Sequence, residues 1–166
     1  MIPFYSPELK DFRPGIVPGG EVPVTLITPN RVETIKDFTV SVLGAMWRIK
    51  KGSTGDLMSY PWFAAPLYDP FSAAAASIWH DERYKHGDAL QFLLAQGVTP
   101  GTIAYWREKY PTRNHARMFS DIGWYLIAIS GHSPETRMPK WKARLGYEGL
   151  KLFAFRSWKN HRAIRG

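Results

Sequence analysis

The sequence has no cysteine among its 166 residues. Disulfide bonds and catalytic thiolates are therefore excluded, and any metal would be held by histidine, aspartate or glutamate. Long apolar runs are also missing, because the most apolar segment, Ile122 to Ile129, is far shorter than the roughly 20 residues that cross a bilayer. The first residues lack a basic start followed by an apolar stretch, so we expect a soluble protein without an export signal.

Acidic residues are scarce at one end of the chain. Residues 137–166 hold 9 basic residues and 1 acidic residue, whereas residues 1–136 hold 13 of each, so the net charge of +8 belongs to the last 30 residues. This asymmetry predicts a basic tail that meets nucleic-acid phosphates or an acidic protein surface. A basic helix face that is simply solvated explains the same pattern equally well.

The composition is that of a folded domain, with 45% hydrophobic and 22% charged residues. We expect one domain of the α+β class, in which short antiparallel strands precede a mainly helical body. Its predicted parts are an extended proline-rich arm over 1–20, two or three short strands within 21–51, a helical body over 52–136 and a basic helix or tail over 137–166.

Turn signals and hydrophobic spacing define the expected helices. An alanine-rich helix begins at a Ser72 cap and ends near Lys85, and a second long helix begins at Asn114 and stops at Gly131. Two shorter helices are expected over 88–97 and 99–110. The last helix, over 139–160, places four apolar residues on roughly one face: Trp141, Leu145, Leu152 and Phe155.

Several polar residues stand out from this apolar framework. His80 and Asp81 end the alanine-rich stretch, and Tyr84 lies one turn beyond His80 on the same face. Asp121 lies within an apolar helix, where an unpaired carboxylate is costly, so it needs Arg117, His80 or a bound cation as partner.

A third carboxylate, Asp56, follows two glycines in a long loop. Three carboxylates and one imidazole suit a divalent cation such as Zn, Mn, Mg or Fe. The alternative is that His80 and Asp81 make core hydrogen bonds and that Asp121 pairs with Arg117.

Three segments, "IKKGSTGDLMSYPWF", "AAAASIWHDERY" and "RNHARMFSDIGWYLIAISG", carry a resemblance to a known family. In this order they resemble the domain-of-unknown-function family thirteen-fifty-three, which is found largely in tailed bacteriophages and prophages. The matching positions are Gly52, Asp56, Ser59 and Pro61, then His80, Asp81 and Tyr84, then Arg113 or Arg117 with Asp121. Gly55 and Ser120 differ from the residues usual in that family, and 87–111 resembles an insertion.

The resemblance implies a phage protein made in the host cytoplasm and located in the virion. The first hypothesis is a structural or virion-associated protein of the tail or baseplate, with other phage structural proteins as partners. The alternative is a metal-dependent hydrolase acting on cell-wall polymer or another phage-relevant substrate, with a metal-bound water as nucleophile. In it Asp56, His80, Asp81 and Asp121 hold the metal, and Tyr84 and Arg117 are catalytic. A third hypothesis is nucleic-acid binding through residues 137–166.

Overall fold

The structure is a computed structural model, and it describes residues 22–28, 31–42, 45–56, 73–86, 113–130 and 137–163, with single residues at 100, 104 and 108. The α+β prediction is confirmed, because short antiparallel strands precede three helices in these ranges. The elements are β1 (Val24–Thr28), β2 (Arg31–Thr34), β3 (Phe38–Val42), β4 (Ala45–Ile49), β5 (Thr54–Asp56), α2 (Ala74–His86), α5 (Arg113–Ser130) and α6 (Lys140–Ala163).

The strands form two small antiparallel sheets. β2 is the central strand of a three-stranded sheet in the order β1-β2-β5, with Val32 opposite both Leu26 and Gly55. β3 pairs with β4, and Val40 lies opposite Trp47. Alternate residues of β2 and β3 are buried, as expected for strands with one face on a core.

The start of the predicted loop after Gly52 is a strand instead. β5 pairs with β2 through Arg31 opposite Asp56 and Glu33 opposite Thr54. A strand of three residues is too short to show an alternating pattern, and its hydrogen-bond partners lie more than 20 residues earlier. Local sequence therefore could not reveal it, and the expected loop at this point is wrong.

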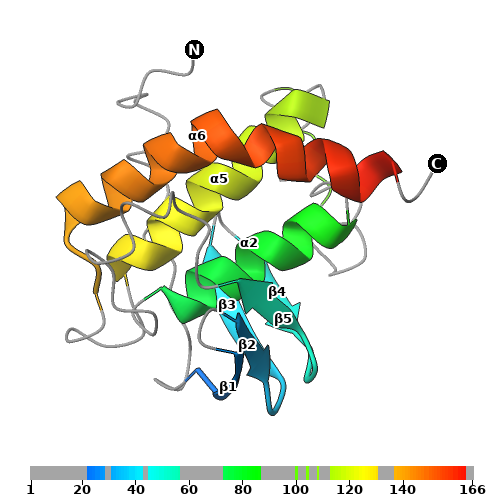
Figure 1. Cartoon of the computed structure of the whole chain (residues 1–166), viewed down its shortest axis with the longest axis vertical. Coiled ribbons are helices and arrows are strands. Elements are labelled where there is room, and N and C mark those ends of the chain that lie inside the picture. The colour runs from blue at the N-terminus through cyan, green and yellow to red at the C-terminus, as the bar shows by residue number, and fades with distance from the viewer. Residues whose placement is uncertain are drawn as a thin grey trace.

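The helices are stacked on the three-stranded sheet. α2 packs against β5 on one side and α5 on the other, and α6 covers the far side of α5 (Figure 1). β1 and α6 therefore lie at opposite ends of the stack. Within the part of the chain that the structure describes, no helix combines the length and apolar character needed to span a bilayer.

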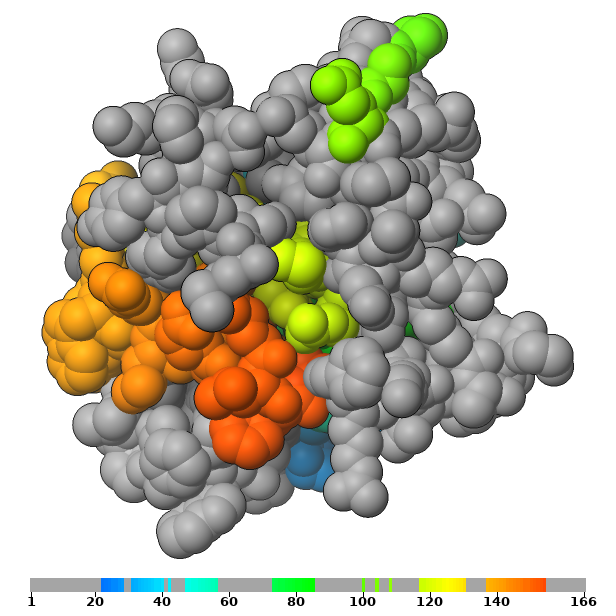
Figure 2. Space-filling view, turned by 90° about the horizontal axis from the view of Figure 1, so that it is seen from above, coloured from blue at the N-terminus to red at the C-terminus, as the bar shows by residue number. Residues whose placement is uncertain are grey.

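The three long helices begin and end close to their predicted positions. On α6, Trp141, Leu145 and Leu152 share one side of the helix, as predicted, and that side points to solvent. The side chain of Phe155, the fourth residue of the predicted face, lies outside the described part of the structure. Seen from above, the first half of α6 lies on the surface of the molecule (Figure 2). The predicted arm over 1–20 and nearly all of the two shorter helices fall outside the described residues.

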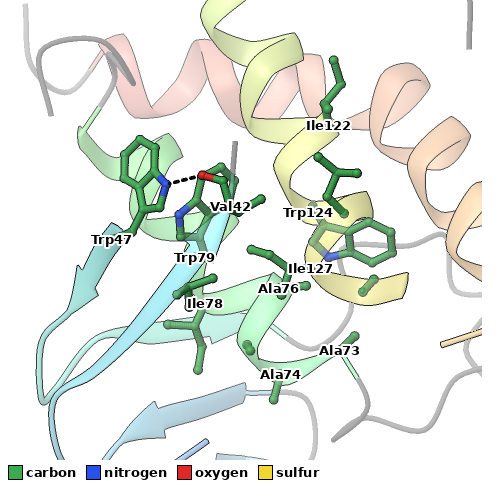
Figure 3. Packing of buried hydrophobic residues seen from close by; sticks show 14 of the residues in the cluster. Val42, Trp47, Ala73, Ala74, Ala76, Ile78, Trp79, Ile122, Trp124 and Ile127 are labelled. Carbon is green, nitrogen blue, oxygen red and sulfur yellow. Dashed lines mark hydrogen bonds between the residues drawn. The ribbon is translucent and has the colours of Figure 1, made fainter. Parts of the chain in front are cut away.

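The core is centred on aromatic side chains between the β3–β4 pair and the helices. The rings of Trp47 and Trp79 meet edge to face with centroids 5.3 Å apart, and Phe119 lies 6.3 Å from Trp47. Trp47 donates a hydrogen bond from Nε1 to the carbonyl oxygen of Val42 at 3.0 Å (Figure 3). This bond satisfies the indole N–H of a completely buried ring.

Gly123 lies on α5 directly against the Trp79 indole. A Cβ atom at position 123 would overlap ring atoms Cη2 and Cζ3 of Trp79. We expect Gly123→Ala to destabilise the protein by about 1–3 kcal/mol, because the overlap outweighs the gain of about 1 kcal/mol in helix propensity. Chemical denaturation measures this change.

The matched control for Gly123→Ala is the double variant with Trp79→Leu, which removes the overlapping ring atoms. The Gly123→Ala substitution should cost much less in the Trp79→Leu background than in the parent protein. Equal costs in both backgrounds would contradict the close packing of α5 on α2.

Candidate functional site

The predicted polar residues meet where α2 crosses α5. His80, Asp81 and Tyr84 lie on α2, and Arg117 and Asp121 lie one turn apart on α5. The alanines that open α2 are buried, and their small side chains allow close contact with neighbouring elements. The structure thus brings five of the six predicted site side chains together.

His80 lies between two carboxylates. Its Nε2 atom is 3.0 Å from Oδ1 of Asp121, and its Nδ1 atom is 3.4 Å from Oδ1 of Asp81. The imidazole is only 2% exposed. A neutral imidazole has one N–H, whereas the imidazolium donates from both nitrogens. The protonated form therefore fits this position, because each ring nitrogen faces an acceptor.

Asp121 is the centre of the network. Its carboxylate is fully buried, and it accepts hydrogen bonds at both oxygens. Tyr84 donates its hydroxyl to Oδ1 at 2.7 Å, and Arg117 donates from Nη1 to Oδ2 at 3.1 Å. The sequence left open whether Arg117 or His80 is the partner of Asp121, and in the structure both residues contact its carboxylate.

Burial and the nearby carboxylates perturb the pKa values of two α2 residues in the network, His80 and Tyr84. Burial by itself would lower the pKa of His80, but the hydrogen bonds and charges of Asp121 and Asp81 outweigh it and raise that pKa to about 9. Burial raises the pKa of the Tyr84 phenol, and the charge of Asp121 raises it further. At neutral pH the site therefore holds an imidazolium and a neutral phenol.

Asp81 connects the network to the sheet. Its Oδ2 atom accepts a hydrogen bond from the backbone N–H of Asp56 at 2.7 Å. Asp56 itself is exposed, and it joins the site through its main chain. The side chain of Asp81 is 22% exposed, whereas that of His80 is 2% exposed, so Asp81 is the residue of this ion pair that contacts solvent.

Two further features hold β5 against α2. Gly55 allows the close approach, because a Cβ atom there would come within 2.8 Å of the Ile78 Cα. Lys85 donates hydrogen bonds from Nζ to the carbonyl oxygen and the Oγ1 atom of Thr54 at 2.9 and 3.0 Å. The position of Asp56 beside Asp81 thus follows from the packing of a strand on a helix.

The metal site stays a prediction. His80, Asp81 and Asp121 are adjacent, as a shared ligand role requires, but their polar atoms are engaged with one another and with Tyr84, Arg117 and the Asp56 amide. Within the ranges that the structure describes, no group of three or more His, Asp or Glu side chains is arranged to hold a metal ion.

Arg83 is a buried charged residue that the sequence analysis did not single out. It is 1% exposed, and its guanidinium lies 4.6 Å from the Trp47 ring centroid and 5.9 Å from that of Trp79. Burial lowers the pKa of Arg83 to about 9, against the opposing charge of Glu82. Its position one turn after Trp79, on the same side of an alanine-rich helix, is the signal that could have marked Arg83 as a buried residue, although that signal does not identify Trp47 as its neighbour.

This arrangement can keep charged side chains, and the proton on His80, in the interior of the protein. The imidazolium of His80 and the guanidinium of Arg117 face the carboxylates of Asp81 and Asp121, so two positive groups meet two negative ones. Such a balanced, hydrogen-bonded set is the form in which charged groups are tolerated away from water. It fixes α2 against α5 and, through Asp81, against β5.

Comparison with known proteins identifies no relative of this chain. No protein-family model matches the chain, and neither a curated protein nor a solved structure is significantly similar to it. The resemblance to domain-of-unknown-function family thirteen-fifty-three therefore stays a prediction from the three segments that carry it.

Proposed function

We propose that the chain is a structural or virion-associated protein of a tailed bacteriophage, in the tail or baseplate. The observation that carries this proposal is that large apolar side chains are exposed at two opposite ends of the stack. One set lies at the β1–β2 end, where Leu26, Ile27 and Ile35 are each about half exposed, at 48, 48 and 54%. The other lies on α6.

Large exposed hydrophobic residues mark interaction surfaces when they gather in patches. A component of a larger particle contacts neighbours on more than one side, and exposed apolar side chains at both ends of the stack fit that need. The resemblance of the three sequence segments to phage proteins supports the same role. The buried charge network then holds together α2, α5 and β5, the elements that lie between these two ends.

Purified particles test the proposal. Particles released by the phage or induced prophage that carries this gene are banded on a density gradient and analysed by mass spectrometry. We expect the chain to follow the particles at a constant ratio to a known structural protein. Complete, infectious particles that lack the chain would overturn the proposal.

The metal-dependent hydrolase is the second candidate, and the adjacency of His80, Asp81 and Asp121 favours it. In this role Tyr84 would donate a hydrogen bond to developing charge on the substrate, as it donates to Asp121 in the structure. Elemental analysis of the purified protein tests it against His80→Gln, with Asp37→Ala, an exposed carboxylate elsewhere, as the control. A stoichiometric metal lost only in His80→Gln supports the candidate, and equal metal content in all three proteins removes it.

A further inference from the structure

Helix α6 has apolar residues on two opposite sides. The inner side packs against the rest of the domain through buried residues spaced four, three and four apart: Ala143, Tyr147, Leu150 and Ala154. The outer side repeats the same spacing with Trp141, Leu145, Glu148 and Leu152, which we call the outer stripe. A shift of two residues turns a helix by about 200°, so the outer stripe lies opposite the packed side.

The outer stripe is open to solvent. Trp141, Leu145 and Leu152 are 60, 43 and 74% exposed. Residues spaced alternately four and three apart form the seam by which one helix packs along another in a coiled coil. The outer stripe therefore has the pattern of a helix-pairing seam that is solvent-exposed in this chain.

Basic residues border the outer stripe. Lys142 follows one side of it, and Arg144 and Lys151 follow the other, at the positions that flank a helix-pairing seam. The Nζ atom of Lys142 lies 5.5 Å from the Trp141 ring centroid. Both borders carry the same sign of charge, so electrostatic complementarity requires acidic residues on the occupant.

Charge and polarity decide between the occupants that this surface could take. A second copy of α6 would place basic borders against basic borders, which is repulsive. Nucleic acid would pair with the basic borders but offers little apolar surface to cover Leu145 and Leu152. Glu148 lies in the middle of the stripe, paired with Lys151 at 2.7 Å. A bilayer would therefore have to bury this charged residue among its apolar chains, which is unfavourable.

We propose that the outer stripe binds an amphipathic α-helix of another protein, with an apolar seam bordered by aspartate or glutamate. The inference rests on the proposed function, since that protein would be a neighbouring component of the particle. Leu145, Leu152 and Trp141 pack into the partner's seam, and Lys142, Arg144 and Lys151 pair with its acidic borders. Glu148 is the polar seam residue that sets the register.

A designed peptide tests this surface directly. The probe is a fluorescent peptide of about three heptads, with leucine at the seam, one asparagine among them and glutamate at both borders. Its glutamates prevent pairing with itself, and a second peptide carries lysine at the same borders. Fluorescence anisotropy with the full chain measures both, and we expect binding of the acidic peptide only.

Adjacent residues of α6 supply matched variants. Leu152→Ala removes a stripe residue, and we expect it to weaken binding about tenfold or more. Phe153→Ala removes a neighbour that is 60% exposed but points about 100° away, and we expect a change of less than about twofold. Changing Lys142, Arg144 and Lys151 together to glutamate should transfer binding to the lysine-bordered peptide.

Other outcomes overturn the inference. These are equal binding of both peptides or of neither, equal effects of Leu152→Ala and Phe153→Ala, and displacement of the acidic peptide by duplex DNA or anionic vesicles. Self-association that Leu152→Ala abolishes, seen by sedimentation, would assign the stripe to a second copy instead. Failure here while the chain still follows purified particles overturns this inference alone, whereas absence from particles overturns the proposed function.

Discussion

Replacing Asp121 with alanine should lower the free energy of unfolding by about 3–5 kcal/mol, the cost of removing one partner from a buried ion pair. The variant removes the carboxylate that the His80 imidazole and the Arg117 guanidinium share, so both buried groups lose their partner in Asp121. It also removes the acceptor of the Tyr84 hydroxyl. Because a domain has only about 5–15 kcal/mol of stability, this loss is a large share of the total.

Two further substitutions serve as controls for Asp121→Ala. Asp121→Asn keeps the volume and an acceptor for Tyr84 but removes the charge, so we expect a smaller loss of about 2 kcal/mol. Asp37→Ala removes an exposed carboxylate that pairs with Arg48 and accepts the backbone N–H of Lys51, and it should cost much less stability than Asp121→Ala. Urea denaturation measures all three, and an Asp121→Ala variant as stable as Asp37→Ala would contradict a buried charge network.

Protein stability should fall as the pH rises from about 6.5 to 9 because of His80. The pKa of this imidazole is about 9 in the folded protein, against 6.5 for an unperturbed histidine. Below pH 6.5 both states bind the proton, so the attraction to Asp121 and Asp81 is fully present. Between the two values the unfolded state releases the proton first, and about 3 kcal/mol of stability is lost by pH 9.

The control for this pH dependence is His80→Gln, which cannot be charged. Urea midpoints measured at intervals from pH 6 to 9, with a chelator present, should fall in the parent protein and stay nearly level in the variant. Arg83 and Tyr84 contribute alike to both proteins, so the difference between them reports His80. Parallel curves for the parent and His80→Gln would mean that the imidazole is not held as a cation between two carboxylates.

Much of the fold follows from local signals. The alanine run gives α2, and Pro111 and Gly131, which lie close to the two ends of α5, allow its bounds to be predicted within one or two residues. The apolar surroundings of Asp121 alone show that it needs a partner, because desolvating an unpaired carboxylate is costly. These conclusions depend on the helical period and on the chemistry of single residues.

The role of Asp56 was decided by strand pairing. The sequence placed its side chain with His80 and Asp81, whereas β5 pairs with β2 and presents the Asp56 amide to Asp81. Arg83 is a similar case, because only the packing of α2 beside β4 brings its guanidinium onto Trp47. Such contacts join residues far apart in the chain, and no local pattern encodes them.

Helix α6 separates what the sequence determined from what the tertiary structure decided. The sequence by itself predicted a basic helix over 139–160 that is apolar on the side of Trp141 and Leu152, and the structure places this helix at Lys140–Ala163. It could not determine which side packs, because two apolar stripes of identical spacing lie about 200° apart. In the tertiary structure, the side of α6 that carries Ala143 and Leu150 packs against the rest of the domain. The bulkier, basic-bordered stripe remains on the surface, because the helix can turn only one of its two apolar sides inward.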